Sequence, residues 1–265
     1  MKKVLPGILL LLIPLIFCSA DNLLTSGVYE WQNLNVRKTR TGEVRDILKS
    51  PTRSLEMFDI KAVTLPGGYG FTKYKVKSGT DELIIIKEGM AVISVNEKSE
   101  RLNEGSIVVA SQGDEVKIQN GAKNDLTYFS FQFKPRQTEP KSKTINKVEP
   151  VIKDWFDIEF KENANGGRRD IMRQPTSVLK ELEMHTTQLK AGLPSHNSHK
   201  HIDEEIILVR FGIVEESING KPFRCGPGSV IFLTNDDDHG IRNAGEFPCE
   251  YYAIRWLVNT EVSDK

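Results

Sequence analysis

Short apolar runs recur along the chain, and turns that contain glycine or asparagine separate them. Residues 83–86 and 106–110 form two such runs, and residues 206–209 and 229–233 form two more. Most of these residues are β-branched and favour extended backbone, and no stretch keeps the 3.6-residue period of an amphipathic helix. Many short strands at regular spacing predict an all-β protein, folded as a sandwich or a barrel.

The chain also contains an internal repeat. The sequence RDILKSPT at residues 45–52 returns 124 residues later as RDIMRQPT at residues 169–176. After a one-residue deletion the spacing is 123, and it is kept by the pairs Gly89 and Gly212, Gly105 and Gly228, Asn120 and Asn243, and Tyr128 and Tyr251. One register kept over so many positions indicates a duplication. We therefore predict two tandem β-barrels, at residues 27–136 and 151–258.

Two further segments lie outside these barrels. Residues 137–150 contain proline and lysine but no aromatic residue, which is typical of a linker. At the N-terminus two lysines precede an apolar run, at residues 4–17, that is too short to span a bilayer, and small residues follow it. This pattern predicts a signal peptide, residues 1–20, and export to a bacterial periplasm. Lipid anchoring through Cys18 is the alternative, although Phe17 fits a lipoprotein site poorly.

The composition is that of an ordinary soluble protein. With 38% hydrophobic and 27% charged residues, disorder and a many-span membrane protein are excluded. The 36 basic and 36 acidic residues balance, and loss of the two lysines of the signal peptide leaves a net charge of −2, so nucleic acid is not an expected partner. Export would bring Cys225 and Cys249 into an oxidising compartment. The sequence leaves two alternatives there, a disulfide between them or two buried thiols.

All five histidines lie beyond residue 184, in the second unit. On a predicted strand His199 and His201 point the same way, Glu205 keeps their parity, and His239 would come from a neighbouring strand. Three imidazoles and one carboxylate that converge inside a barrel form a site for a divalent first-row metal. Such a site leaves one or two positions for water or substrate.

This part of the sequence resembles the paired motifs of the cupin superfamily. The first motif is matched by Gly192, His199, His201, Glu205 and Gly212, and the second by Gly228, His239 and Asn243. Thr234 and Asp236 replace a proline and a glycine of the second motif, at turn positions. The resemblance implies double-stranded β-helix (jelly-roll) barrels. It also implies that one ion of Mn, Fe, Zn or Ni is bound by His199, His201, Glu205 and His239.

The first unit keeps the framework of the motifs without the ligands. At the four ligand positions it has Val76, Ser78, Glu82 and Val116. Two valines and a serine do not hold a divalent ion, so we expect a metal-free barrel. Its expected role is to cover the sheet of its partner, and a separate ligand pocket is the less favoured option.

Other residues near the motifs are candidates for catalysis or substrate binding. His196 precedes His199 in a loop and is either an acid/base group or an exposed loop residue. His185 either faces the barrel or is a hydrogen-bonded strand residue. Arg255 and Tyr251 share one face of a late strand, where they could contact a polar or anionic substrate.

The leading functional hypothesis is an exported, metal-dependent enzyme of hydrolase, isomerase or lyase type. Glu205 and His196 would be its catalytic groups, and its substrate a small polar metabolite, with carbohydrate derivatives among the candidates. The alternatives are an Fe(II) dioxygenase and a non-catalytic periplasmic binding protein. The arrangement resembles that of ureidoglycine aminohydrolase-like proteins, but those usually have another ligand set and an intracellular substrate. A homodimer is open, since a two-barrel chain can act as its own pseudo-dimer.

Overall fold

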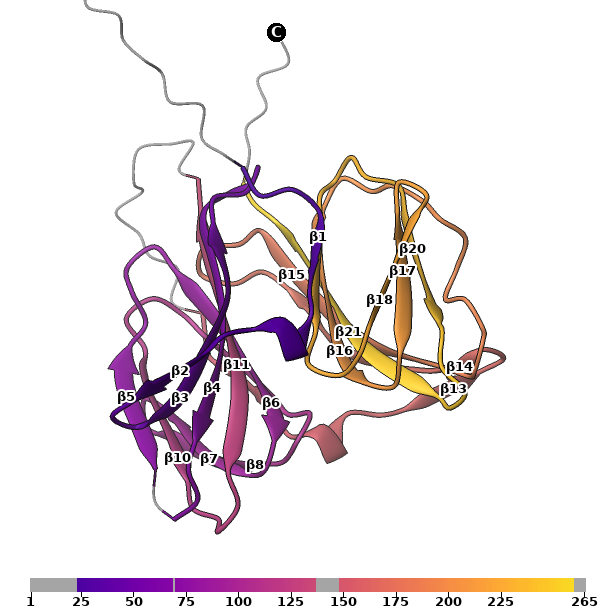
Figure 1. Cartoon of the computed structure of the whole chain (residues 1–265). Coiled ribbons are helices and arrows are strands. Elements are labelled where there is room, and N and C mark those ends of the chain that lie inside the picture. The colour runs from indigo at the N-terminus through magenta and orange to yellow at the C-terminus, as the bar shows by residue number, and fades with distance from the viewer. Residues whose placement is uncertain (1–22, 69, 137–147, 260–265) are drawn as a thin grey trace, which may run out of the picture.

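The computed structural model describes residues 23–68, 70–136 and 148–259, and this part of the chain is almost entirely β (Figure 1). It contains strands β1 to β21 and the short 3-10 helices η1 (Trp31–Asn33) and η2 (Trp155–Asp157). The all-β prediction is confirmed. The described residues include no helix that is long and apolar enough to cross a membrane. The predicted signal peptide, Cys18 and most of the predicted linker lie outside the described residues.

The first barrel consists of two facing sheets. The larger has seven strands in the order β12-β9-β6-β11-β4-β3-β2, and the smaller has four in the order β5-β10-β7-β8. The strands are β2 (Val36–Thr39), β3 (Gly42–Ser50), β4 (Leu55–Leu65), β5 (Phe71–Lys75), β6 (Asp81–Glu88), β7 (Ala91–Val95), β8 (Lys98–Leu102), β9 (Ile107–Ala110), β10 (Glu115–Asn120), β11 (Leu126–Pro135) and β12 (Val151–Lys153).

The second barrel repeats this plan with one strand fewer. Its larger sheet has the order β1-β19-β16-β21-β15-β14-β13, and its smaller sheet has three strands, β18-β17-β20. The strands are β1 (Gly27–Tyr29), β13 (Lys161–Asn163), β14 (Gly166–Gln174), β15 (Glu181–Leu189), β16 (Glu204–Phe211), β17 (Val214–Ile218), β18 (Lys221–Cys225), β19 (Val230–Leu233), β20 (His239–Asn243) and β21 (Cys249–Leu257). Among the residues that the structure describes, no strand of this barrel corresponds to β5.

Both faces of the large sheets are buried, which explains the continuous apolar runs in the sequence. In β6, Leu83 and Ile85 point into a core shared by the two barrels, while Ile84 and Ile86 point into the interior of the first barrel. Strand β16 repeats this division in the second barrel. The shared core includes Phe58, whose ring centroid lies 5.0 Å from that of Trp256, so the barrels meet through well-packed aromatic side chains.

The two halves of the chain exchange their first strands. Strand β1, from the N-terminal half, pairs with β19 of the second barrel, with Val28 opposite Ile231. In return β12, at the start of the second half, pairs with β9 of the first barrel, with Ile152 opposite Val108. The predicted boundaries at residues 27 and 151 fall on the starts of these strands, but each strand completes the sheet of the other half.

A tryptophan after each exchanged strand fixes the exchange. Trp31 packs on Gly228 of the second half, and Trp155 packs on Gly105 of the first. A Cβ atom at either glycine would come within 2.7 Å of the indole ring, and both glycines have a positive φ. The repeated glycine pair therefore allows close packing across the interface of the two barrels as well as a turn.

Two equivalent acids lock the interface from both sides. Glu204, at the start of β16, accepts hydrogen bonds from Thr52 Oγ1 at 2.7 Å and from the backbone nitrogen of Arg53 at 3.0 Å. Asp81, at the start of β6, accepts from Ser177 Oγ at 2.6 Å and from the backbone nitrogen of Val178 at 3.0 Å. Both carboxylates are almost completely buried, so these hydrogen bonds replace their lost hydration.

Candidate metal centre

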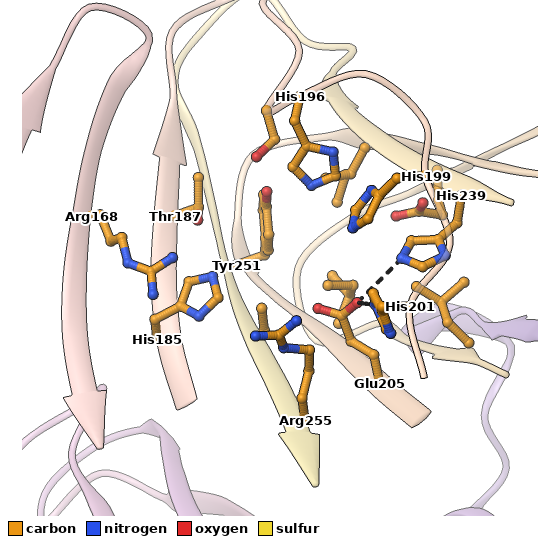
Figure 2. Close-up of a pocket in the computed structure, with 16 residues that line it drawn as sticks. Arg168, His185, Thr187, His196, His199, His201, Glu205, His239, Tyr251 and Arg255 are labelled. Carbon is orange, nitrogen blue, oxygen red and sulfur yellow. Dashed lines mark hydrogen bonds and ion pairs between the residues drawn. The ribbon is translucent and has the colours of Figure 1, made fainter. Parts of the chain in front are cut away.

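A pocket of about 230 Å³ opens into the second barrel between its large and small sheets (Figure 2). It contains all five histidines of the chain: His185, His196, His199, His201 and His239. The other polar lining residues are Arg168, Thr187, Ser195, Glu205, Glu216, Tyr251 and Arg255. The uneven distribution of histidine along the sequence thus corresponds to one site.

The segment before β16 brings the histidines together without forming a regular strand. His199 makes an isolated bridge with His239, with two backbone hydrogen bonds of 3.0 Å. His201 lies outside any strand, and only Glu205 belongs to β16. The expectation of one strand through all three residues is therefore wrong. The expectation that His239 comes from a neighbouring strand is confirmed, since it begins β20.

The imidazoles of His199, His201 and His239 offer nitrogen atoms that all lie within 4.8 Å of one another. His201 Nδ1 donates to the carbonyl of Asp203 at 2.9 Å, and His239 Nδ1 donates to the carbonyl of Asp237 at 3.0 Å. A neutral imidazole has one N–H group, so in both residues the Nε2 lone pair is left for a ligand. Backbone carbonyls commonly orient metal-binding histidines in this way.

Glu205 completes a set of converging acceptors. Its Oε2 lies 3.0 Å from His201 Nε2 and 3.3 Å from His239 Nε2, and the latter nitrogen is buried without a hydrogen bond. Burial would raise the pKa of Glu205, but the two histidines lower it to about 2. Lone pairs and a carboxylate that face one another need a cation between them. The residues present therefore fit a divalent metal ion, and the role of Glu205 as fourth ligand stays a prediction.

His196 and His199 lie at the outer side of this cluster. Their rings meet edge to face with centroids 4.4 Å apart. The pKa of His199 is lowered by burial and by His196 and the other histidines, which favours the neutral form that binds a metal. His196 is exposed, and its Nδ1 donates to the carbonyl of Asn197 at 2.9 Å. It is near enough to the triad for an acid/base role, which stays a prediction.

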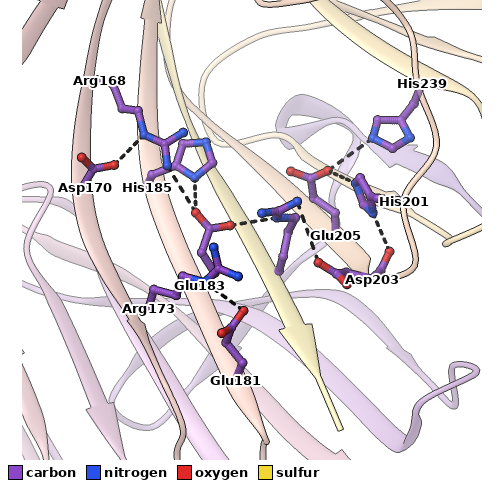
Figure 3. Close-up of polar contacts among 11 residues, drawn as sticks. Arg168, Asp170, Arg173, Glu181, Glu183, His185, His201, Asp203, Glu205 and His239 are labelled. Atoms are coloured by element: carbon purple, nitrogen blue, oxygen red, sulfur yellow. Dashed lines mark hydrogen bonds and ion pairs between the residues drawn. The ribbon is translucent and has the colours of Figure 1, made fainter.

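A second polar group lies across the pocket from the triad, and Glu183 is its centre (Figure 3). Glu183 lies 2.8 Å from Arg255 Nε, 2.7 Å from His185 Nδ1 and 3.4 Å from Arg168 Nη2. Burial opposes ionisation of Glu183, but His185 and Arg255 lower its pKa to about 2. The carboxylate thus fixes three basic side chains at the wall of the pocket. Both alternatives considered for His185 hold, since it lines the pocket and is hydrogen-bonded.

The two predicted substrate contacts both line the pocket. Arg255 is held by Glu183 and lies 3.8 Å from Asp203, next to the segment that carries His201. Tyr251 is almost completely buried, and burial raises the pKa of its hydroxyl. Figure 2 shows Tyr251 between His185 on one side and the triad of His199, His201 and His239 on the other. Their role in substrate binding stays a prediction.

Two pocket residues were missed by the sequence reasoning. Glu216, on β17, is buried with both carboxylate oxygens unpartnered, and burial raises its pKa to about 8 although His239 opposes the shift. Arg168, on β14, reaches Glu183 from the far wall. Comparison of the repeats would have found both, because the first unit has Ile93 and Val44 at these positions.

The corresponding place in the first barrel is apolar. Val76 and Val116 are buried in the core of that barrel, and Ser78 is exposed. In the described part of the chain, the only group of three potential metal ligands that lie close together is the triad of the second barrel. A metal-free first barrel is what this side-chain set predicts.

The two cysteines of the described chain are both free. Cys225 and Cys249 are buried in the second barrel, where burial raises the pKa of the Cys225 thiol to about 12 and that of Cys249 to about 11. Of the two options open from the sequence, the structure shows buried thiols.

Comparison with known proteins agrees with this fold. Residues 185–255 match the family model of the cupin domain. The oxalate decarboxylase of Lactobacillus farciminis, in its formate complex, has a TM-score of 0.68 at 13% identity, over 90% of this chain and 88% of that chain. The oxalate decarboxylase of Bacillus subtilis gives 0.67 at 13%, over 89% and 77%.

Protein Ylba from E. coli gives a TM-score of 0.68 at 14% identity, over 92% of this chain and 97% of that chain. No curated protein matches the sequence. Identities this low establish a shared two-barrel fold, and the family model places the cupin domain in the barrel that contains the triad.

Proposed function

We propose that this chain, a two-barrel protein of the cupin superfamily, is an exported enzyme that uses one divalent metal ion to act on a small polar metabolite. The observation that carries the proposal is the convergence of His199, His201 and His239 within 4.8 Å, with Glu205 against two of them. When bound, a divalent ion supplies Lewis acidity toward a carbonyl or hydroxyl group, or lowers the pKa of water. Hydrolysis, isomerisation and lyase chemistry all use this property.

The opposite wall supports a polar or anionic substrate. Arg168 and Arg255 direct positive charge at the pocket, and Glu183 restricts their motion. A guanidinium held in this way binds a carboxylate with two parallel hydrogen bonds. The structural neighbours named oxalate decarboxylase act on a small dicarboxylate, which supports testing small carboxylates and sugar acids first.

Two side chains are suited to moving a proton. His196 is exposed at the mouth of the pocket, where it can exchange protons with solvent. Glu216 is buried and unpartnered, and its raised pKa keeps it protonated near neutral pH, so it can donate a hydrogen bond to a bound substrate. An acid at the base of the pocket and a base at its mouth is a useful arrangement for proton transfer.

Metal analysis of protein purified from its native compartment tests the metal site. We expect one equivalent per chain, a large loss in His201→Ala, and no loss in Ser78→Ala, the same substitution at the equivalent position of the first barrel. Equal metal content in the two variants, or none in the wild type, would exclude the site.

Turnover separates an enzyme from a binding protein. Thermal-shift screening with sugar acids, uronates and ureides identifies ligands, and Glu205→Ala is then expected to abolish turnover of a hit while the fold is kept. Binding without turnover in either protein would support a binding module. Full activity without oxygen, with Mn or Zn, would exclude the dioxygenase alternative. Detection of the mature N-terminus at Asp21 tests export.

A further inference from the structure

The first barrel has a pocket of its own, on the face that corresponds to the metal centre. Its volume is about 400 Å³, larger than the 230 Å³ of the second-barrel pocket. Valines and Leu65 form part of its wall, while Tyr74 and Tyr128 add two hydroxyl groups. Loss of the histidines has therefore left a hollow barrel interior and not a filled one.

A buried acid lies in this pocket with one oxygen unused. Glu82 is 1% exposed, and its Oε1 accepts a hydrogen bond from Ser130 Oγ. Its Oε2 is buried and has no hydrogen-bond partner in the described part of the chain. Burial raises the pKa of Glu82, and the side chains of Ser130, Lys61, Tyr74 and Gln132 oppose this rise. An unpartnered buried carboxylate oxygen is costly, so its retention points to a ligand that donates to it.

The charge at the rim of the pocket is positive. Four lining residues are basic, and Glu82 is the one acid among them. Arg37 pairs with Asp46 at 3.1 Å, but Lys61, Lys75 and Lys77 are not within ion-pair distance of any acid in the described chain. Three lysines around one opening attract an anion.

We propose that the first-barrel pocket binds a small hydroxycarboxylate, with its carboxylate at Lys61, Lys75 and Lys77 and a hydroxyl group donating to Glu82 Oε2. Lys61 and Glu82 lie on the same face of the large sheet, because Lys61 is opposite Ser130, Glu82 is opposite Gln132, and these two partners are two residues apart on β11. A ligand that lies along this face reaches both side chains. The apolar wall between them contacts the carbon chain.

The donor is a hydroxyl group and not an ammonium group. An ammonium group has three N–H donors and a positive charge, and Lys61, Lys75 and Lys77 already place positive charge at this opening. A buried cation with unfilled donors is unfavourable, whereas a hydroxyl group needs one acceptor. The site therefore prefers hydroxy acids over amino acids. This inference concerns the other barrel, so it stands or falls independently of the metal-dependent function.

Calorimetric titration of the full chain, with the metal site removed by His199→Ala and His201→Ala, tests this proposal. The probes are glycerate, threonate and gluconate, with propionate as the analogue without hydroxyl groups and serine as the one with an ammonium group. We expect one hydroxycarboxylate site per chain and about 10- to 100-fold weaker binding of propionate and serine, as for loss of one hydrogen bond to a charged group.

Variants of the pocket place the site. Glu82→Gln and Lys61→Met are each expected to weaken hydroxycarboxylate binding at least 10-fold, whereas Lys123→Met, at an exposed lysine outside the pocket, leaves it unchanged. Thermal unfolding confirms that each variant folds, because removal of an unpaired buried acid does not lower stability. No binding of any hydroxycarboxylate, binding unaffected by Glu82→Gln, or equal binding of propionate or serine would overturn the proposal.

Discussion

The two barrels share a backbone plan and a glutamate but differ in what surrounds that glutamate. Glu205 in the second barrel faces His201 and His239, and its pKa falls to about 2 in spite of burial. Glu82 at the equivalent position faces Ser130, and burial raises its pKa. The comparison shows that the fold supplies a buried carboxyl group, and that the neighbouring side chains decide whether its pKa falls or rises.

The backbone differs only where the ligands differ. In the first barrel the segment before β6 contains the regular strand β5, paired with β10. In the second barrel the corresponding segment is one residue shorter and makes isolated bridges at Pro194 and His199. In this irregular segment His199 and His201 lie close to His239, and His201 contacts Glu205.

The largest effect is expected from transplanting imidazoles into the first barrel. In Val76→His combined with Val116→His, two polar rings replace two buried valine side chains of an apolar core cluster. We expect a loss of about 3 to 5 kcal/mol in the free energy of unfolding. Denaturant titration measures it, and Ser78→His, at an exposed position, is the control with almost no loss. Wild-type stability of the double variant would show that the two buried valines are not what separates the barrels.

Substitution of the two interface acids, Glu204 and Asp81, should lower the free energy of unfolding by unequal amounts. Glu204→Ala leaves the Thr52 and Ser54 hydroxyls and two backbone N–H groups without their acceptor, and we expect a loss of about 3 kcal/mol. Asp81→Ala removes two hydrogen bonds, for a loss of about 2 kcal/mol. Thermal unfolding of both variants in parallel measures the difference. A larger effect of Asp81→Ala would contradict this assignment of the hydrogen bonds.

Substitution of the two equivalent glutamates by glutamine should change the free energy of unfolding in opposite directions. In metal-free protein at pH 7, Glu205→Gln is expected to lose about 2 to 3 kcal/mol, because a pKa lowered from 4.5 to about 2 stabilises the folded state. This contribution is complete above pH 4.5 and is lost as the pH falls toward 2. Glu82→Gln is expected to gain stability, since a raised pKa destabilises the fold as the pH rises above 4.5.

Unfolding measured from pH 3 to pH 8 follows both changes. The two variants should approach the wild type at the acid end of the range, each from its own side. Changes of the same sign at pH 7 would mean that the two carboxylates have the same environment.

The smallest effect concerns the thiols, which only the second barrel has. Cys225 and Cys249 stand where the first barrel has Leu102 and Leu126, and they are free. A reductant should therefore leave the unfolding temperature unchanged, and mass spectrometry should find two alkylated thiols after denaturation. A lower unfolding temperature in the presence of reductant would mean that Cys225 and Cys249 form a disulfide.

The sequence predicted the architecture and the ligand set because both leave local patterns. Strand-sized apolar runs and the repeat indicated two barrels, and the spacing around His199 and His239 indicated the metal centre. The sequence did not predict the exchange of β1 and β12, because the short apolar runs at Val28 and Ile152 do not indicate which sheet they join. The interruption of the strand before Glu204 was also missed, because alternation assumes a straight strand.

Single polar residues were harder to assign from the chain alone. Glu216 resembles any polar residue of a half-exposed strand until the structure shows that it lies on the buried side of β17, together with Val214 and Ile218. Arg168 becomes part of the site only because Glu183, fifteen residues away in the chain, lies 3.4 Å from it on the neighbouring strand β15. Burial and distant pairing are properties of the whole fold, and no local pattern carries them.

The exchange of first strands gives the chain the connectivity of a swapped dimer within one polypeptide. A dimer made of two separate chains would dissociate on dilution, and each partner would then expose an unpaired β-edge. Covalent linkage replaces that equilibrium by a high effective concentration, so pairing of the halves does not depend on the amount of protein. It also permits asymmetry: each half keeps its neighbour folded, while one holds the metal ligands and the other is free of them.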